Sequence, residues 1–156
     1  MTASGGNGQT KRGMRPVLRD YQILEALHTA RYLTTEQIQR LFWTDTRGGK
    51  GEWGRVKACQ QRLRLLCDSG YVRRIQLPIR RGDKPQPYIY ALDRKGAELL
   101  TSELGIEPQE IDWRPKAHEE HFPFMEHLLT TTDFRIALMQ ATLQMGVTLE
   151  EWLDEK

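Results

Sequence analysis

The sequence has only two cysteines and no long hydrophobic run, and both facts restrict the class of protein that it encodes. Cys59 and Cys67 lie eight positions apart in one predicted helix, about 12 Å along its axis, which is too far for a disulfide bond between them. No apolar stretch approaches the ~20 residues that a helix needs to cross a bilayer, and the polar start does not resemble a signal peptide. We therefore expect a reduced, cytoplasmic protein with no membrane partner.

Motifs for nucleotide, metal or covalent chemistry are also missing. Gly49 and Lys50 are followed by glycine rather than by Ser or Thr, so the pair is not a phosphate-binding loop. His118 and His121 are three positions apart, not four as in a zinc-protease helix, and a weak transition-metal site with His127 is a minor alternative. No Ser/His/Asp arrangement or carboxylate pair has a supporting context. The sequence therefore predicts a binding protein with no enzyme activity, no cofactor and no metal.

The chain has little net charge, +2, but its charges are unevenly distributed. Residues 1–95 contain 19 Lys/Arg and 8 Asp/Glu, a balance of +11, whereas residues 96–156 contain 4 and 13, a balance of −9. A basic half of this kind suits a polyanionic partner such as a nucleic acid. Residues 1–16 are rich in glycine and polar side chains, and we expect them to be a disordered basic tail.

The first part of residues 17–105 predicts three helices in the order of a helix-turn-helix. Apolar residues at helical spacing predict a first helix at 17–31. Thr34 followed by Gln37 is a capping-box pattern, so a short second helix should begin there. The third helix is expected at 54–69, where the apolar spacing resumes and a glycine follows.

A strand pair and a further helix come next. Residues 71–77 and 88–92 alternate between apolar and polar side chains and flank a basic turn at 78–87, which predicts a two-stranded wing. Asp93 is a suitable N-cap for a fourth helix at 94–104. The predicted fold class is mainly α, within α+β: a winged helix-turn-helix with a two-stranded wing and a long C-terminal helix.

The third predicted helix supplies the candidate contacts to duplex DNA. At 100° per residue, Lys57, Gln61 and Arg64 project opposite an apolar stripe, and we expect them to enter the major groove. Phosphate contacts are expected from cations on the helix flank, in the preceding loop and at the tip of the wing. These cations are Arg55 and Arg62, Arg47 and Lys50, and Arg80, Arg81 and Lys84.

Residues 106–122 predict a connector, and residues 123–156 contain a long helix to about position 145. This helix is apolar on two sides, more than a small domain covers by itself. We expect homodimerisation as the cover, and a further domain downstream is the rival, because the end of the chain resembles an element that is just beginning. The expected dimerisation residues are Phe124, Leu128, Phe134, Ile136, Leu138, Met139 and Leu143.

Several segments resemble the replication-relaxation family of bacterial mobile-element proteins. The resemblance rests on L-R-D-Y-Q-I-L-E-A-L, Y-L-T-T-E-Q-I-Q-R-L-F, R-L-R-L-L-C-D-S-G-Y-V-R-R, Y-I-Y-A-L-D-R-K-G-A-E-L-L and E-H-L-L-T-T-T-D-F-R-I-A-L, and it covers about residues 17–138. It implies a DNA-binding protein tied to plasmid replication and relaxation. Longer relatives continue into a nuclease-like half, whose activity is not carried over to this chain.

Three functions fit these patterns. The leading one is duplex DNA binding, sequence-specific or structure-tolerant, in plasmid or mobile-element replication or DNA relaxation. A transcriptional repressor of the MarR or PadR kind would use the same chemistry on a promoter. A protein–protein adaptor, in which the basic helix and wing meet an acidic partner, belongs to another class.

Overall fold

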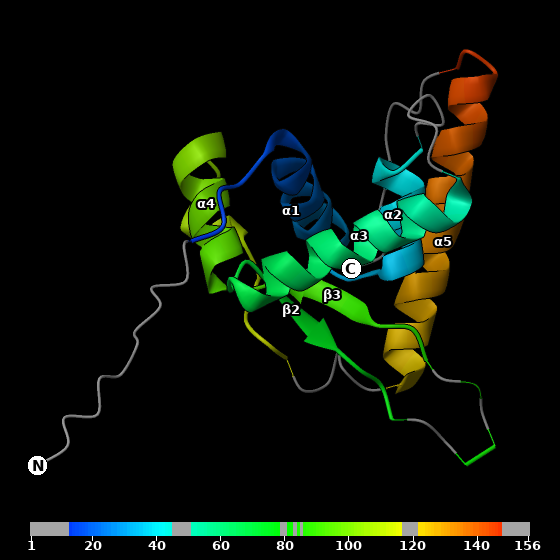
Figure 1. Cartoon of the computed structure of the whole chain (residues 1–156), viewed down its shortest axis with the longest axis horizontal. Coiled ribbons are helices and arrows are strands. Elements are labelled where there is room, and N and C mark those ends of the chain that lie inside the picture. Colours follow the sequence, from blue (N-terminus) through cyan, green and yellow to red (C-terminus); the bar gives the residue numbers. More distant parts are fainter. Residues whose placement is uncertain are drawn as a thin grey trace, which may run out of the picture.

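The computed structural model describes residues 13–44, 51–78, 81–82, 84, 86–116 and 122–147. Within these parts the chain forms five α-helices, one 3-10 helix and a three-stranded antiparallel sheet (Figure 1). The mainly helical α+β class predicted from the sequence is confirmed at this level. The elements are α1 (Leu18–Ala30), β1 (Leu33–Thr34), α2 (Thr35–Phe42), α3 (Glu52–Asp68), β2 (Val72–Ile75), β3 (Ile89–Leu92), α4 (Arg94–Leu104), η1 (Pro108–Glu110) and α5 (Phe122–Gln144).

The helix ends follow from local side chains, and the sequence predicted three of those described next, the start of α2 and both ends of α4. The backbone N–H of Gln37 donates to the Thr34 hydroxyl at 3.2 Å, and the N–H of Thr34 donates to the Gln37 side chain at 2.9 Å, so the capping box is formed. The Asp93 carboxylate accepts from the N–H of Arg94 at 2.8 Å, and α4 ends at Gly105 with φ 67°. Each of these three ends is encoded within a few residues of sequence.

The sheet has the order β1–β3–β2, so β3 is its central strand. Leu33 pairs with Tyr90 in one ladder, and Val72 pairs with Leu92 in the other. The short strand β1 was not predicted, and the predicted alternation within β3 is wrong because all four of its residues are buried. A strand with both sides buried must be covered on both faces of the sheet.

One face of the sheet supports the main core. Side chains from α1, α2, α3 and α4 meet β2 and β3 there, and Leu24, Leu63 and Leu100 are completely buried. The start of α4 approaches the backbone so closely that a Cβ at Gly96 would lie 2.2 Å from the carbonyl oxygen of Tyr71. Only glycine fits at this position.

The second face of the sheet is covered by the first half of α5. Met125 is completely buried and forms a second cluster with Tyr32, Leu77, Ile89 and Ala91. The sequence predicts that a helix with two apolar sides needs more cover than a small domain supplies. One of the two sides is covered within the chain, because the sheet offers it an apolar face.

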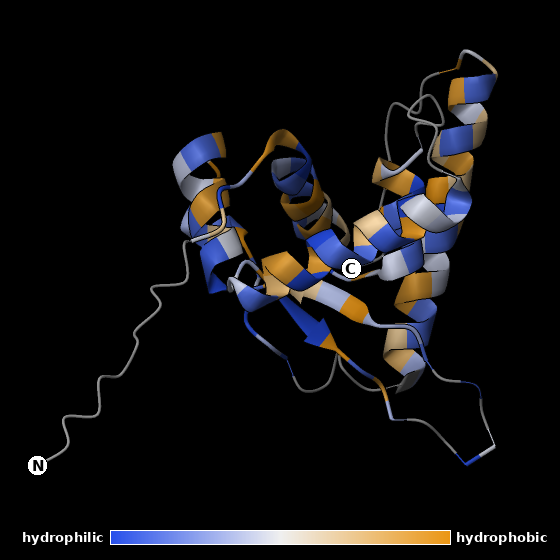
Figure 2. Cartoon of the chain, in the orientation of Figure 1, coloured by the Kyte–Doolittle hydropathy of each residue, from blue (hydrophilic) through white to orange (hydrophobic). Residues whose placement is uncertain are grey.

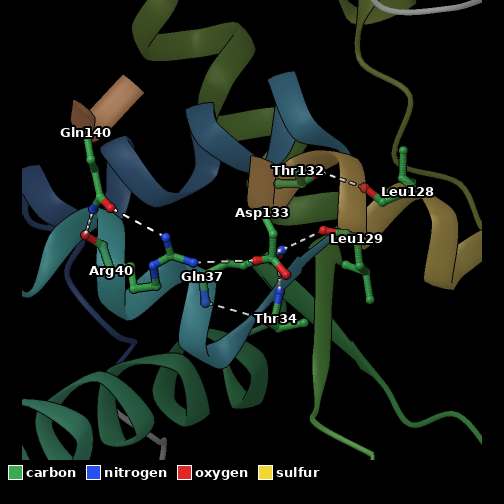
Figure 3. Close-up of polar contacts among 8 residues, drawn as sticks. All are labelled: Thr34, Gln37, Arg40, Leu128, Leu129, Thr132, Asp133 and Gln140. Carbon is green, nitrogen blue, oxygen red and sulfur yellow. Dashed lines mark hydrogen bonds and ion pairs between the residues drawn. The ribbon is translucent and has the colours of Figure 1, made fainter. Parts of the chain in front are cut away.

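A polar network joins α5 to α2 (Figure 3). The Gln37 amide donates to the carbonyl of Leu129 at 3.0 Å and to the Asp133 carboxylate at 2.9 Å, while its oxygen caps α2. One turn later, Arg40 lies 3.6 Å from Asp133, and Gln140 donates to the Arg40 carbonyl at 3.2 Å. The same buried amide therefore begins α2 and holds α5 against it.

The connector is attached to the end of α1 by an ion pair. The Asp112 carboxylate lies between Arg31 and Lys116, and its distance to Lys116 Nζ is 2.6 Å. The hydrogen bonds from these two cations, first that from Arg31, lower the pKa of Asp112 below its ordinary value. The carboxylate therefore helps to attach the connector mainly in its ionised form.

Candidate nucleic-acid interface

Helix α3 presents a continuous and mostly polar strip to solvent. The strip consists of five exposed residues, Trp53, Lys57, Gln60, Gln61 and Arg64. At roughly 100° per residue their side chains fall within an arc of about 100° on the helix surface. Along the helix axis this strip extends about 16 Å, at a rise of 1.5 Å per residue.

The opposite side of α3 fixes the orientation of this face. Cys59, Leu63 and Leu66 are completely buried against the neighbouring helices and the sheet. The Cys59 thiol donates to the carbonyl of Thr35 at 3.9 Å, and burial raises its pKa to about 12. Cys59 is thus a protonated core residue, and it directs the polar strip away from the core.

Arg62 has an internal partner. Its Nε donates to Asp20 Oδ1 at 2.7 Å, and a terminal guanidinium nitrogen contacts the other carboxylate oxygen. Asp20 is completely buried and also accepts from the N–H of Val17 at 2.7 Å, at the start of α1. The hydrogen bond from Arg62 to Asp20 raises the pKa of the guanidinium. Arg62 therefore joins α3 to α1, and we leave it out of the proposed DNA contacts.

The predicted phosphate contacts lie in several places around α3. Arg55 is half-buried on the same flank as Arg62, and Arg81 and Lys84 are exposed in the loop between β2 and β3. The described parts of this loop extend away from the helical body (Figure 1). At its base, the Arg74 guanidinium lies 4.3 Å from the centre of the Tyr88 ring, a cation–π contact. The remaining predicted cations, Arg47, Lys50 and Arg80, lie outside the described residues, as do His118 and His121.

Sequence reasoning brought together Lys57, Gln61 and Arg64 but missed two members of the strip. Trp53 is 79% exposed in the first turn of α3, and Gln60 is exposed one turn beyond Lys57. Their three- and four-residue spacing from Lys57 and Arg64 was a usable signal. Arg64 also lies 3.9 Å from Asp68 in an exposed pair, which water screens strongly.

The predicted dimerisation residues divide between the two sides of α5. Ile136 is 3% exposed and Leu128 is half-buried against the second core, so these two contact the chain's own domain. Met139 lines a groove of about 360 Å³ between α1, α2 and α5. Phe124, Phe134 and Leu138 lie on the outward side of α5, where Phe134 is the most exposed of the three. Leu143 is 76% exposed but lies on the inner side, in line with Met125, so we leave it out of the proposed dimer contacts.

The described parts of the chain contain no cluster of three or more His, Cys, Asp or Glu side chains that could bind a metal ion. Among the helices of these same parts, none combines the length and the apolar content that crossing a bilayer requires.

Comparison with known proteins assigns the chain to a family. Residues 24–156 match the family model described as replication-relaxation. The chain belongs to the replication-relaxation family. A search of curated proteins and a search of solved structures found no match. The part of the chain shared with the replication-relaxation family includes both the polar strip of α3 and the whole of α5.

Proposed function

We propose that residues 17–105 form a winged helix-turn-helix that binds duplex DNA during the replication or relaxation of plasmids or other mobile elements. In this proposal α2 and α3 are the helix-turn-helix, α3 is the recognition helix, and the β2–β3 hairpin is the wing. The observation that carries it is the polar strip of α3, which is exposed, uncovered by the core and rich in residues that bind bases and phosphates. Membership of the replication-relaxation family supports the biological setting.

The chemistry of the strip suits the major groove. A groove about 12 Å wide admits one α-helix, and a strip of about 16 Å covers four to five base pairs at a rise of 3.4 Å. Arg64 can donate two hydrogen bonds to guanine, and Gln60 or Gln61 can both donate to and accept from adenine. Lys57 supplies charge next to them.

Arg55 and the wing cations would hold the phosphates on either side. Phosphate contacts position a protein on DNA but carry no sequence information. Their number sets the salt dependence, because each neutralised phosphate releases counterions. With about six such contacts, affinity should fall roughly 10³-fold between 50 and 200 mM salt.

We further propose that the protein is a cytoplasmic binding protein rather than an enzyme, and that it binds DNA as a homodimer. Dimeric helix-turn-helix proteins place two recognition helices on half-sites about 34 Å apart. A dimer therefore doubles the contacted sequence without a larger domain.

The experiment that tests DNA binding is fluorescence anisotropy with a mixed-sequence duplex, titrated across salt. Lys57→Ala/Arg64→Ala removes two cations from the strip, and Arg114→Ala/Lys116→Ala removes two exposed cations from the connector as a matched control. We expect a loss of at least about 30-fold for the first pair, and less than about 3-fold for the control.

Two results would contradict the proposal. Equal affinities of the two double variants would mean that α3 is not the recognition helix. Negligible binding of any duplex at low salt would favour the adaptor hypothesis, in which the basic half meets an acidic protein.

A further inference from the structure

The outward side of α5 carries a regular uncharged seam, and five of its seven residues are apolar. Its positions recur alternately at three and four residues, an average of 3.5, which is the spacing of the two core positions in a coiled coil. The seam consists of Phe124, His127, Thr131, Phe134, Leu138, Ala141 and Met145. None of the seven is Asp, Glu, Lys or Arg, although such residues make up 28% of the chain.

The seam lies nearly opposite the side of α5 that packs on the domain. With 100° of rotation per residue, the centre of the seam is rotated by roughly 160° around the helix axis from Met125 and Ile136. These two residues are buried within the chain. Phe134 is 63% exposed and Met145 is 77% exposed. The N–H of Met145 donates to the carbonyl of Ala141 at 3.1 Å, so the helical path reaches the last seam residue.

The domain does not bury this seam, because the inner side of α5 is the side that packs on the sheet and α2, and Phe134 and Met145 stay more than half exposed. Hydrophobic residues nevertheless continue along α5 to its C-terminal end, beyond the part that lies beside α2 (Figure 2). A surface helix normally buries one apolar stripe and keeps its other side charged. An uncharged second stripe with heptad spacing is typical of a helix that packs against another helix with the same spacing.

We propose that this partner is α5 of a second copy of the chain, packed along the seam as a two-helix coiled coil. The inference deepens the proposed homodimer and rests on that part of the proposed function alone. A second copy of the chain carries the same seam, so the two surfaces match without a second partner protein. A two-fold symmetric arrangement gives a closed dimer that does not grow further. Phe134 and Leu138 lie at the middle of the seam, where the partner would exclude water most completely.

The area of the seam is sufficient for a modest dimer. Phe124 and Phe134 are 44% and 63% exposed, and an aromatic side chain offers about 200 Å², so the two rings contribute roughly 200 Å² per copy. With Leu138, Ala141 and Met145 the total reaches on the order of 500 Å² per copy. Two copies would then bury about 1,000 Å², the lower limit of a stable interface. We therefore expect a dimer that dissociates on dilution.

Sedimentation equilibrium of the full chain, over a range of protein concentrations, tests this inference. Phe134→Glu places a charge at the middle of the seam, and we expect it to raise the dissociation constant at least about 30-fold, as for a central interface residue. Leu143→Glu is the matched control, because Leu143 is a comparably exposed apolar residue, 76% exposed, on the other side of the same helix. Its dissociation constant should change less than about 3-fold. Circular dichroism confirms that both variants fold.

The outcomes separate this inference from the proposal of DNA binding. A wild-type chain that is monomeric at every concentration overturns the seam dimer, as does a dimer that Leu143→Glu disrupts and Phe134→Glu does not. Either result leaves the anisotropy assay of the α3 strip unaffected. Conversely, a dimer that Phe134→Glu disrupts but that binds no duplex would support the seam dimer and contradict only the proposal of DNA binding.

Discussion

Replacing Gln37 with methionine should test how α5 is held to the rest of the molecule. The side chain is 1% exposed, and its amide makes three hydrogen bonds, to the N–H of Thr34, the carbonyl of Leu129 and the carboxylate of Asp133. Methionine has a similar shape but cannot replace any of them. The variant thus removes half of the capping box and the link to α5 without opening a large cavity.

The expected loss follows from the environment of each bond. The two bonds to backbone groups, one buried and one partly buried, are each worth about 1 kcal/mol, and a bond to a charged acceptor is worth about 2 kcal/mol. The Asp133 side chain is 56% exposed, so water replaces part of its bond, and about 1 kcal/mol is a better figure for that contact. The free energy of unfolding should therefore fall by about 3 kcal/mol, and the melting temperature by roughly 6–12 °C.

Urea denaturation followed by circular dichroism measures this loss. Gln39→Met is the control, because Gln39 is a half-buried amide on the same helix, and we expect its change to stay within about 0.5 kcal/mol. A double-mutant cycle with Asp133→Ala isolates the bond across the two helices. Equal midpoints for Gln37→Met and Gln39→Met would show that the network does not hold α5, and the reasoning would fail.

Three further changes test other contacts in the structure. Arg62→Ala leaves the buried Asp20 without its cation and should lower the free energy of unfolding by about 3 kcal/mol. The DNA affinity of the folded variant should stay within about 3-fold of wild type. A large loss of affinity in a stable variant would show that Arg62 belongs to the DNA interface. Gly96→Ala forces a methyl group against the Tyr71 carbonyl and should lower the free energy of unfolding by more than about 3 kcal/mol. The control Gly13→Ala has open space around it and should change the free energy of unfolding in urea by less than about 0.5 kcal/mol. Similar urea midpoints for the two variants would show that α4 can shift to accommodate the methyl group. Because the pKa of Asp112 is lowered in the folded chain, its ion pair should contribute fully above the unfolded pKa of about 4 and be lost as pH falls through the folded pKa. Urea midpoints of wild type and Asp112→Asn should therefore differ at neutral pH and converge in acid, and a constant difference would contradict the assignment.

The sequence determined the features that depend on near neighbours along the chain. The capping box of Thr34 and Gln37, the cap at Asp93 and the end of α4 at Gly105 each need only a few adjacent residues, and all were predicted. Most of the polar strip of α3 could also be predicted from the sequence, because side chains three and four positions apart share one face of a helix in any fold. Heptad spacing on α5 is a property of the same local kind.

Tertiary structure alone decided which of these faces are used internally. Arg62 and Asp20 are 42 positions apart, and nothing in the local pattern distinguished Arg62 from Arg55 as the residue with an internal partner. Gln37 meets Asp133 across 96 positions, and that contact places α5 over the second face of the sheet, so that β3 is buried on both sides and its predicted alternation fails. Helical periodicity determines which side chains share a face of the helix. Whether that face is buried depends on which distant part of the chain packs against it, and this contact forms only in the folded structure.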